Sequence, residues 1–583
     1  MSELQKSLPM NRSGSWMSLP AELRIMILKH VDESDAPDDP CREPPPRLAA
    51  CAAVSREWQM HFEAVTFRHL ELHQDDLDKL AEYLPARSYR VDMLRSVHLR
   101  LVLDEYNCRF CGSREEPWEA SANNVILTEA LWKLFNGMAA WGNPRSRPLE
   151  LELSAHSPSD WEHAYKPLRF RARDRHRGGH NRHEAAERSE VDDDPGHFWS
   201  DGLRNRAPGT SAWRRVQGSG LRIDNQCSAV KNQPTLPPVH MVGALVIRRQ
   251  FYRRFGVYSC LSRMIKALPN LFSFCYEPWR ASRASPHDVE RQMRHYLFLV
   301  RIISQYPNIR KVSIFEDFND LNGFVRLPAT APRQKDPSMS ALLAKTSRPW
   351  EWASFSFMAD AADFFHEFWP KAEAQNSVTE SPARWENLTR LCLTSDLLHP
   401  SGDVGGLLGA AARAAMLMPK LESLTLWNAG RGHGGFFQYS IGRNGRPEIW
   451  MGSTWGARLD PQTAELWTRV ACQWQPRYPL VKFFLKLREG DMGSHGSILW
   501  MLRDPFVATR RSQEQLLSEG LTKSQFAATH PEAIVARSIS LVQGTLVFKI
   551  STLKGVGPEL AYELLPRARK AENSEPARSQ IAE

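Results

Sequence analysis

The sequence predicts a protein of mixed helix and strand content, of the α+β or α/β class, built from three consecutive parts. Apolar residues at helical spacing near the N terminus predict a small helical unit. Repeated segments, in which a helix leads through a proline or polar corner into a short alternating strand, predict an irregular α/β stack over 239–435. Aromatic, β-prone segments separated by glycine-rich turns predict a β-rich end over 436–564.

The N-terminal unit carries the signals of a helix start. Ser18 can cap the helix, Pro20 fits a first turn that needs no backbone N–H, and Glu22 favours the positive end of the helix dipole. An apolar stripe at helical spacing follows, formed by Leu19, Leu23, Ile27, Leu28 and Val31. A second helix can supply the opposing apolar face through Leu48, Cys51, Val54 and Trp58. Because two such helices bury little apolar surface, we expect the unit to need a partner or the following domain.

Residues 16–72 resemble an F-box of the fungal type. The resemblance rests on the order Leu-Pro-x-Glu, then Ile, then Leu, then Val-x-Arg-x-Trp, although Ser55 stands where the family commonly has cysteine and a long acidic, proline-rich connection spans 32–46. In F-box proteins these positions bind the Skp-type adaptor of a cullin ubiquitin ligase. The resemblance therefore implicates Leu19, Pro20, Glu22, Ile27, Leu28, Leu48, Val54 and Trp58 in adaptor binding. The alternative is a helical hairpin packed on its own protein.

The composition is that of a globular protein long enough for two to four domains. The first 15 residues contain no apolar leader segment, and we expect 1–15 to form a disordered tail. The most apolar later stretch, 405–418, is short and broken by Arg413, which favours a core helix over a membrane span. Nine scattered cysteines favour thiols in a reducing compartment, so we expect a cytoplasmic or nuclear protein without a membrane partner.

Much of the net charge of +9 lies in an insertion expected over 166–238. This segment is rich in arginine, histidine and glycine, is poor in apolar residues, and includes the acidic run 192–194, so it predicts largely disordered chain. An arginine-rich tract can also contact phosphates or act in nuclear localisation. The tract lacks interleaved aromatic residues that would stack on bases, so the sequence does not favour nucleic-acid binding.

The stack is expected from a recurring spacing, Leu-x-x-Leu-x-Leu or a close variant, at 264–274, 302–314, 385–393 and 418–426. One such unit cannot bury its apolar face without neighbours. A further unit is expected near 352–365, and 94–101 predicts an earlier strand within the first helix and strand units of 73–165. The pattern resembles the degenerate leucine-rich solenoids that often follow F-boxes. The alternative is an unrelated α/β domain with short strands.

The open side of such a stack is the expected site of a target protein. Contacts should come from polar or aromatic positions beside the inward apolar residues, and the candidates are Arg310, Lys311, Arg390, Thr425 and Trp427. The tryptophans between 427 and 474 could contact a partner, but burial is the usual fate of large aromatic side chains. The last segment, 565–583, is expected to be a disordered tail.

The sequence offers no complete catalytic motif. Residues 183–187 lack the last ligand of the zinc-protease motif, and 405–409 lack the pattern of a nucleotide-binding loop. Cys108 and Cys111 have the spacing of a zinc knuckle, but no second pair follows, and His98 and Cys227 are the only further candidate ligands. We therefore expect a turn with two half-buried thiols, no metal, no cofactor and no enzymatic activity.

These features together predict the substrate-receptor subunit of an SCF-type ubiquitin ligase. The resemblance implies that the F-box binds the Skp-type adaptor and, through it, the cullin. The solenoid would hold an unidentified protein target while other subunits carry out the chemistry. The alternative is an F-box protein that works outside the ligase, as a nuclear interaction protein whose arginine-rich tract binds nucleic acid.

Overall fold

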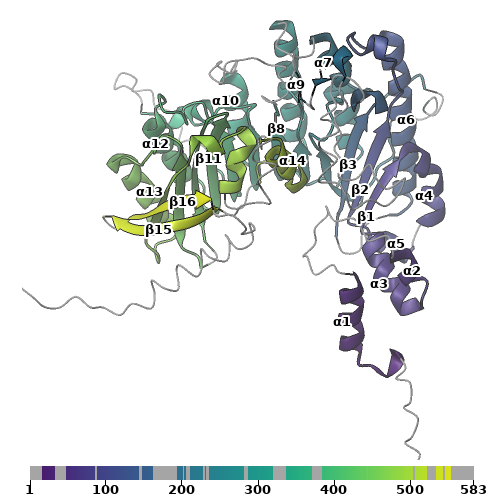
Figure 1. The fold of residues 1–583 in the computed structure, drawn as a ribbon, viewed down its shortest axis with the longest axis horizontal. Helices are drawn as coiled ribbons and strands as arrows, with labels where there is room; N and C mark the ends of the chain where they lie inside the picture. The colour runs from purple at the N-terminus through teal and green to yellow at the C-terminus, as the bar shows by residue number, and fades with distance from the viewer. Residues whose placement is uncertain are drawn as a thin grey trace, which may run out of the picture.

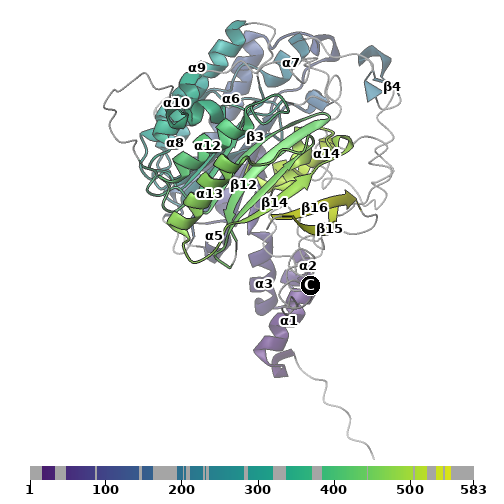
Figure 2. The same cartoon turned by 90° about the vertical axis from the view of Figure 1, so that its left-hand side faces the viewer.

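The computed structural model describes residues 16–32, 48–85, 88–142, 147–161, 194–197, 199–200, 203–204, 210–227, 230, 235–280, 286–318, 337–370, 384–442, 444–502, 506–520, 534–542 and 545–552. The main body is one large sheet with helices along one face. A module of three helices projects from one end of this body (Figure 1; Figure 2). The mixed helix and strand class expected from the sequence is confirmed.

Fourteen strands form the large sheet. Its parallel part consists of β1 (His69–His73), β2 (Ser96–Val102), β3 (Leu149–His156), β6 (Val242–Ile247), β7 (Ser273–Tyr276), β8 (Lys311–Phe315), β9 (Trp352–Ser356), β10 (Arg390–Thr394) and β11 (Ser423–Gly430), in that spatial order. The sheet continues through β12 (His433–Ile441), β13 (Pro447–Ser453), β14 (Val481–Lys486), β16 (Thr545–Thr552) and β15 (Ile534–Val542), where β11 with β12, β12 with β13, and β15 with β16 are antiparallel. A separate antiparallel pair is formed by β4 (Trp199–Ser200) and β5 (Leu203–Arg204). Spatial order follows chain order from β6 to β14, so each new strand is added to the same edge.

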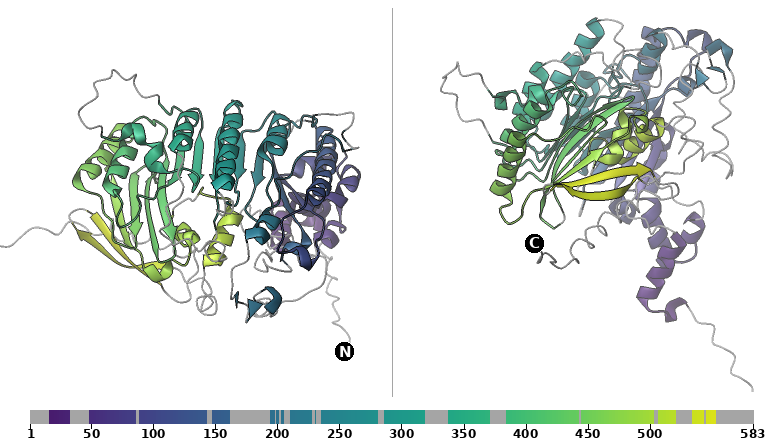
Figure 3. Two further views of the ribbon diagram at one scale, coloured as in Figure 1. Left: turned by 90° about the horizontal axis from the view of Figure 1, so that it is seen from above. Right: turned by 60° about the vertical axis from the view of Figure 1, so that its left-hand side comes forward.

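The helices that connect these strands lie along one face of the sheet (Figure 3). The longer ones are α6 (Pro117–Ala139), α9 (Pro286–Ser304), α10 (Pro337–Thr346), α12 (Val404–Ala415) and α13 (Pro461–Trp474). One further helix, α7 (Thr210–Gln217), packs through Trp213 on Tyr252 and Trp279, beyond the ends of β6 and β7. The shorter helices on the covered face are α4 (Leu77–Tyr83), α5 (Tyr89–Met93), α8 (Ser262–Lys266) and α11 (Ala361–Phe364). Side chains from these helices and from the sheet make one continuous apolar core. We call this side of the sheet the helix face and the other side the open face.

Alternation along the strands divides the side chains between the two faces. Leu151, Leu245 and Phe274 pair in register across three strands and belong to the core under the helices. The intervening positions point to the open face. Over β8 to β14 some of these positions form a second apolar cluster, in which Trp427 and Phe436 pair across β11 and β12. The core repeats laterally from strand to strand, which is why one repeat could not bury it alone.

A C-terminal strap, defined as residues 487–502 and 506–520, returns across the open face (Figure 3). It contains η13 (Glu489–Asp491), η14 (His495–Met501) and α14 (Arg510–Gly520). Ile498 and Leu499 join the aromatic cluster of the open face. The backbone N–H of Thr509 donates to Glu277 Oε1 at 2.7 Å, and the Ser512 hydroxyl also donates to this carboxylate. The strap therefore buries polar as well as apolar parts of the open face.

The N-terminal module consists of η1 (Trp16–Ser18), α1 (Ala21–Asp32), α2 (Leu48–Ala52) and α3 (Arg56–Thr66). Leu28, Leu48 and Phe62 form its small core. Glu63 of α3 connects the module to α5, because it accepts hydrogen bonds from Arg90 Nη2 at 2.7 Å and from the Tyr89 hydroxyl at 2.5 Å. The hydrogen bond from Arg90 is the main reason that the pKa of Glu63 falls to about 2. The carboxylate thus stays charged and paired at neutral pH.

The strands expected from the sequence are present. The four repeat segments end in β7, β8, β10 and β11, the further unit near 352–365 contains β9 and α11, and the early strand is β2. The apolar stretch 405–418 falls in α12, whose inner residues are buried, as expected of a core helix. Among the described residues, no helix is both long enough and apolar enough to cross a membrane.

The insertion expected over 166–238 differs from the prediction in its second half. Residues 210–217 form α7, and Trp213, Leu221 and Ile223 are buried. The prediction of disorder is wrong for 210–227, because these scattered apolar residues pack on the body and the Asp224 N–H donates to the Thr128 hydroxyl of α6 at 2.8 Å. The arginine-rich stretch 166–193 and the tails 1–15 and 565–583 lie outside the described residues. The β-rich end also contains α13 and the strap helices.

Candidate functional site

The first candidate surface is an apolar N-terminal face, formed by side chains that the module leaves exposed. Their exposed fractions run from 39% for Ile27 to 71% for Met17, and the set is Met17, Leu23, Ile25, Met26, Ile27, Val31, Val54 and Met60. Over 21–31, the part of α1 whose burial the structure describes, Leu28 alone is buried. A helix with apolar side chains on several exposed sides is typical of a surface that a partner covers.

The structure divides the eight residues that the F-box resemblance implicates into two groups. Leu28 and Leu48 are buried in the small core of the module, at 2% and 3% exposure, and so support the fold rather than offer a contact. Trp58 packs beside this core and against Trp16, with ring centres 5.5 Å apart. Leu19 is partly buried. Pro20, Glu22, Ile27 and Val54 are exposed and available to a partner.

A polar contact holds α1 against α3. Glu57 of α3 accepts hydrogen bonds from Trp16 Nε1 at 2.8 Å and from Arg24 Nε at 3.0 Å. The hydrogen bond from Trp16 is the main reason that the pKa of Glu57 is lowered. The Trp16 ring also packs against the Trp58 ring of α3. Trp16 therefore joins the segment just before α1 to α3 by both a polar and an aromatic contact.

The second candidate surface is the open face of the sheet, whose first strands carry a buried group of charged side chains. His98 Nε2 lies 2.7 Å from the Ser154 hydroxyl, and Arg248 Nε donates to Glu152 at 2.5 Å. Arg100 Nη1 donates to Glu71 at 3.3 Å. Burial alone would raise the pKa of Glu152, but Arg248 outweighs it and the pKa falls to about 2. Burial lowers the pKa of His98 to about 4, despite the opposing effect of Glu152.

The buried His98 predicts that the free energy of unfolding falls in mild acid. His98 is neutral in the fold and takes up a proton near pH 6.5 when unfolded, so its contribution is complete above pH 6.5 and is lost as the pH falls toward 4. Between pH 7 and 5 this loss is about 2 kcal/mol in the free energy of unfolding. Urea titrations at pH 7 and at pH 5 measure this loss. In His98→Gln the drop in the free energy of unfolding between the two pH values should be smaller than in the wild type by about 2 kcal/mol. The exposed His366→Gln should keep the full loss, and an unchanged His98→Gln profile would contradict the assignment.

The predicted target-binding residues separate into exposed and buried ones. Lys311 Nζ lies 4.0 Å and the Arg390 guanidinium 4.5 Å from the ring centre of Trp352, and Phe506 of the strap lies beside them. We call Lys311, Trp352, Arg390 and Phe506 the cation–aromatic cluster. Lys311, Trp352 and Arg390 are the first residues of β8, β9 and β10 and pair in register. They therefore lie side by side on the open face, at the N-terminal ends of these three strands. All four are partly exposed.

Two of the five predicted target contacts are buried. Trp427 has 0% exposure and packs against Phe357 with ring centres 4.8 Å apart, and Thr425 accepts a hydrogen bond from Gln438 at 3.1 Å. Both lie under the strap or beside β12, which the repeat spacing does not reveal. The prediction that they line an accessible surface is therefore wrong. Arg310 is exposed and pairs with Glu351 at 3.2 Å.

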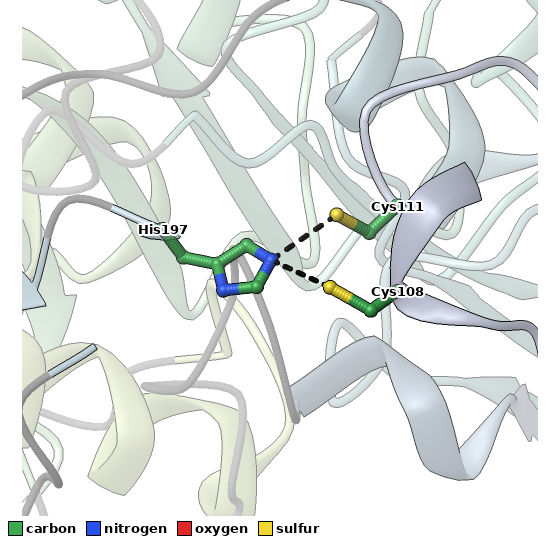
Figure 4. A group of neighbouring side chains, drawn as sticks. All are labelled: Cys108, Cys111 and His197. Atoms are coloured by element: carbon green, nitrogen blue, oxygen red, sulfur yellow. Dashed lines mark hydrogen bonds between the residues drawn. The ribbon is translucent and has the colours of Figure 1, made fainter. Parts of the chain in front are cut away.

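The structure also brings together three side chains that can hold a metal ion, Cys108, Cys111 and His197 (Figure 4). The two thiols were candidates from the sequence, and His197 was not. His98 and Cys227, the other candidates, lie elsewhere: His98 faces Ser154, and the Cys227 thiol is 3.8 Å from Glu129. The signal that could have identified His197 is an aspartate three residues before a histidine, at the end of the arginine-rich stretch.

A small cavity of about 50 Å³ lies close to these thiols, after β2 and β3. Tyr106 donates to Asp160 at 3.1 Å within it, while Arg215 and Arg253 pair with Glu119 and Glu115. Burial raises the pKa of Asp160 to about 6. These ion pairs hold α6, α7 and the loop after β2 together. A structural role therefore explains the charged residues that line the cavity.

Comparison with known families gives one match. Residues 304–506 match a family described as being of unknown function (DUF6546). The match covers about a third of the chain and runs from the end of α9 to Phe506 at the start of the second part of the strap. It therefore includes the cation–aromatic cluster and leaves out the N-terminal module. No curated protein matches the chain.

Proposed function

We propose that the protein is a substrate receptor of an SCF-type ubiquitin ligase, in which the N-terminal module is an F-box that binds the Skp-type adaptor. The observation that carries the proposal is the apolar N-terminal face. Exposed apolar side chains cost free energy in water, roughly 25 cal/mol for each Å² of apolar area, and a partner that covers them regains it. Their position on α1 and beside α3 coincides with the segment that resembles an F-box.

The architecture of the body supports the second half of the proposal, a leucine-rich-repeat-like solenoid that holds a target. The strands β6 to β11 lie side by side in chain order and are parallel to one another, and the helices of these units lie on one face. Stacked units of this kind leave an extended second face for binding. The module projects from the β1 end of the sheet (Figure 1). A target on the body would thus be tethered near a ligase bound to the module, which raises its effective concentration.

The cation–aromatic cluster indicates the chemistry of the target contact. The positive charges of Lys311 and Arg390 both lie over the ring of Trp352, at the N-terminal ends of β8 to β10 on the open face. A partner segment that brings carboxylates or phosphates would pair with these charges, and the exposed aromatic side chains would add apolar contact area. The cluster lies partly on the strap, so the strap contributes to the proposed target site through Phe506.

Charge reversal in the cluster should weaken target recovery without unfolding the body. Lys311→Glu combined with Arg390→Glu is expected to reduce the amount of co-purified target at least about tenfold, because like charges would then face an acidic segment. The melting temperature should stay close to that of the wild type, since neither side chain is buried. Arg294→Glu, exposed on α9 at the helix face, is the matched control. Full recovery by the double variant would move the target site elsewhere.

Affinity purification with the proteasome inhibited tests the function as a whole. The ligase proposal expects adaptor and cullin in the purified complex, together with ubiquitin-modified target. Adaptor without cullin, accompanied by nucleic-acid binding that weakens as salt is raised, would instead support the role outside the ligase. A folded chain that recovers neither adaptor nor cullin would reject the F-box assignment. The arginine-rich stretch enters the test as a deletion of 166–192, which should leave adaptor recovery unchanged.

A further inference from the structure

The strongest feature that the proposed ligase role does not use is the group of Cys108, Cys111 and His197. The sulfur atoms of both cysteines lie 3.3 Å from Nε2 of His197, and all three ligand atoms lie within 4.8 Å of one another (Figure 4). Tetrahedral zinc, with bonds of about 2.3 Å to sulfur and about 2.0 Å to nitrogen, would place these atoms about 3.6 Å apart. For the two sulfur–nitrogen distances, only a shift of a few tenths of an ångström separates the two arrangements.

The local chain presents both thiols on one side of a short turn. Cys108–Phe110 forms a 3₁₀ turn that Asn107 caps by accepting a hydrogen bond from the Arg109 N–H. The Cys111 N–H closes the turn on the Cys108 carbonyl at 3.0 Å. The two-residue spacing therefore brings the sulfur atoms together, as in zinc knuckles. The turn lies in the loop that leaves β2 and leads into α6.

The histidine reaches the turn from a distant part of the chain and is oriented by a carboxylate. His197 Nδ1 lies 2.7 Å from Asp194 Oδ2, so this nitrogen carries the proton and Nε2 directs its lone pair at the two thiols. Histidines that bind metals commonly donate their other N–H to a carboxylate in this way. The aspartate is an independent observation, because it belongs to the histidine's own segment, three residues before His197, and fixes the orientation of the ring.

We propose that Cys108, Cys111 and His197 bind a zinc ion, with Asp194 as the residue that positions the histidine. Two thiolates and one imidazole suit zinc, which accepts sulfur and nitrogen in a tetrahedral arrangement, and water can complete the fourth position. On binding, each thiol loses its proton to solvent and no electron is transferred. The ion would fasten residues 194–197 to the loop after β2, and so anchor the far end of the long segment that separates β3 from α7. This role is structural and independent of the proposed ligase function.

Metal analysis of the purified full-length chain tests the proposal. Protein produced with zinc and passed through a desalting column should hold about one zinc ion per chain. Cys108→Ser, Cys111→Ser and His197→Gln should each reduce the content at least tenfold. Cys472→Ser and His366→Gln, which alter exposed residues outside the group, should keep it. Wild-type protein without zinc, or equal zinc in the ligand variants, would overturn the proposal.

Two further measurements keep the test decisive if a variant folds poorly. Asp194→Asn keeps all three ligands, and should weaken zinc binding by about 10-fold to 100-fold in a chelator competition. In the wild type, zinc should protect two thiols from maleimide, and a chelator should expose them. A disulfide between Cys108 and Cys111, detected by mass under non-reducing conditions in protein prepared with zinc, would contradict the site. Copper in place of zinc in protein prepared with both metals would contradict the assignment of the ion.

Discussion

Arg249→Met is expected to lower the free energy of unfolding by about 3 to 5 kcal/mol, because it leaves a buried carboxylate without its arginine partner and with only His495 beside it. Arg249 and Asp317 both have 0% exposure, and the arginine Nε donates to Asp317 Oδ2 across the open face. Burial alone would raise the pKa of Asp317, but Arg249 and His495 reverse this effect and hold the pKa below its usual value. Methionine keeps an unbranched apolar side chain and removes the charge together with its N–H donors. Denaturant unfolding of the purified chain measures the change.

The control for this prediction is an ion pair of the same kind on the surface. Arg310 pairs with Glu351, but its side chain is 60% exposed, so Arg310→Met should change the free energy of unfolding by no more than about 0.5 kcal/mol. Adding Asp317→Asn to Arg249→Met should restore part of the loss, since no uncompensated charge then remains. If Arg249→Met lowered the free energy of unfolding no more than Arg310→Met does, the Arg249–Asp317 pair would not be needed for the packing of the strap on the sheet.

The buried charges on the open face explain where sequence reasoning reached its limit. Strand positions could be predicted, because alternating apolar residues such as Leu391 and Leu393 must face a core whatever surrounds them. The other side of each strand has no such constraint. Thr425 and Trp427 look like surface residues in the repeat spacing, yet Trp427 is covered by Ile498 and Leu499 of the strap, and Thr425 is buried beside Gln438 of β12. The way the C-terminal strap crosses the open face depends on contacts between residues far apart in the sequence, and such contacts leave no local pattern.

The same distinction applies to the module and to the thiol group. The apolar stripe predicted a helix where α1 lies, but the single second helix expected through Leu48, Cys51, Val54 and Trp58 is wrong: 53–55 form a turn, and Ser55 caps a separate α3. The stripe also could not say that Leu28 would be buried while Ile27 stayed exposed. Helical periodicity gives the apolar positions, and the packing of three short helices decides which of them face inward. Cys108 and Cys111 were visible as a pair because two residues separate them. His197 was not visible, because it is 86 residues from Cys111 and meets it only in the fold.

Ile27→Asp combined with Val54→Asp is expected to abolish detectable binding of the Skp-type adaptor. Both residues belong to the set implicated by the F-box resemblance, and both are exposed, at 39% and 63%. Because the two side chains are only partly exposed, burying the rest of them against a partner is worth about 1.5 to 3 kcal/mol, which corresponds to roughly one to two decades in Kd. Aspartate adds the cost of bringing a charge into an apolar contact. Titration of purified adaptor, followed by calorimetry or fluorescence, measures the loss.

The choice of these two positions separates loss of binding from loss of folding. Truncating Trp58 would also remove adaptor binding, but this side chain packs against Trp16 and Phe62, so the module itself would be disturbed. Ile27 and Val54 lie outside the small core, and the double variant should melt at the wild-type temperature. Tyr258→Asp, at a side chain 74% exposed on the body, controls for placing a charge on an exposed apolar residue. If the folded double variant bound the adaptor as tightly as Tyr258→Asp, the apolar N-terminal face would have to serve another partner, because its exposed side chains would still be uncovered.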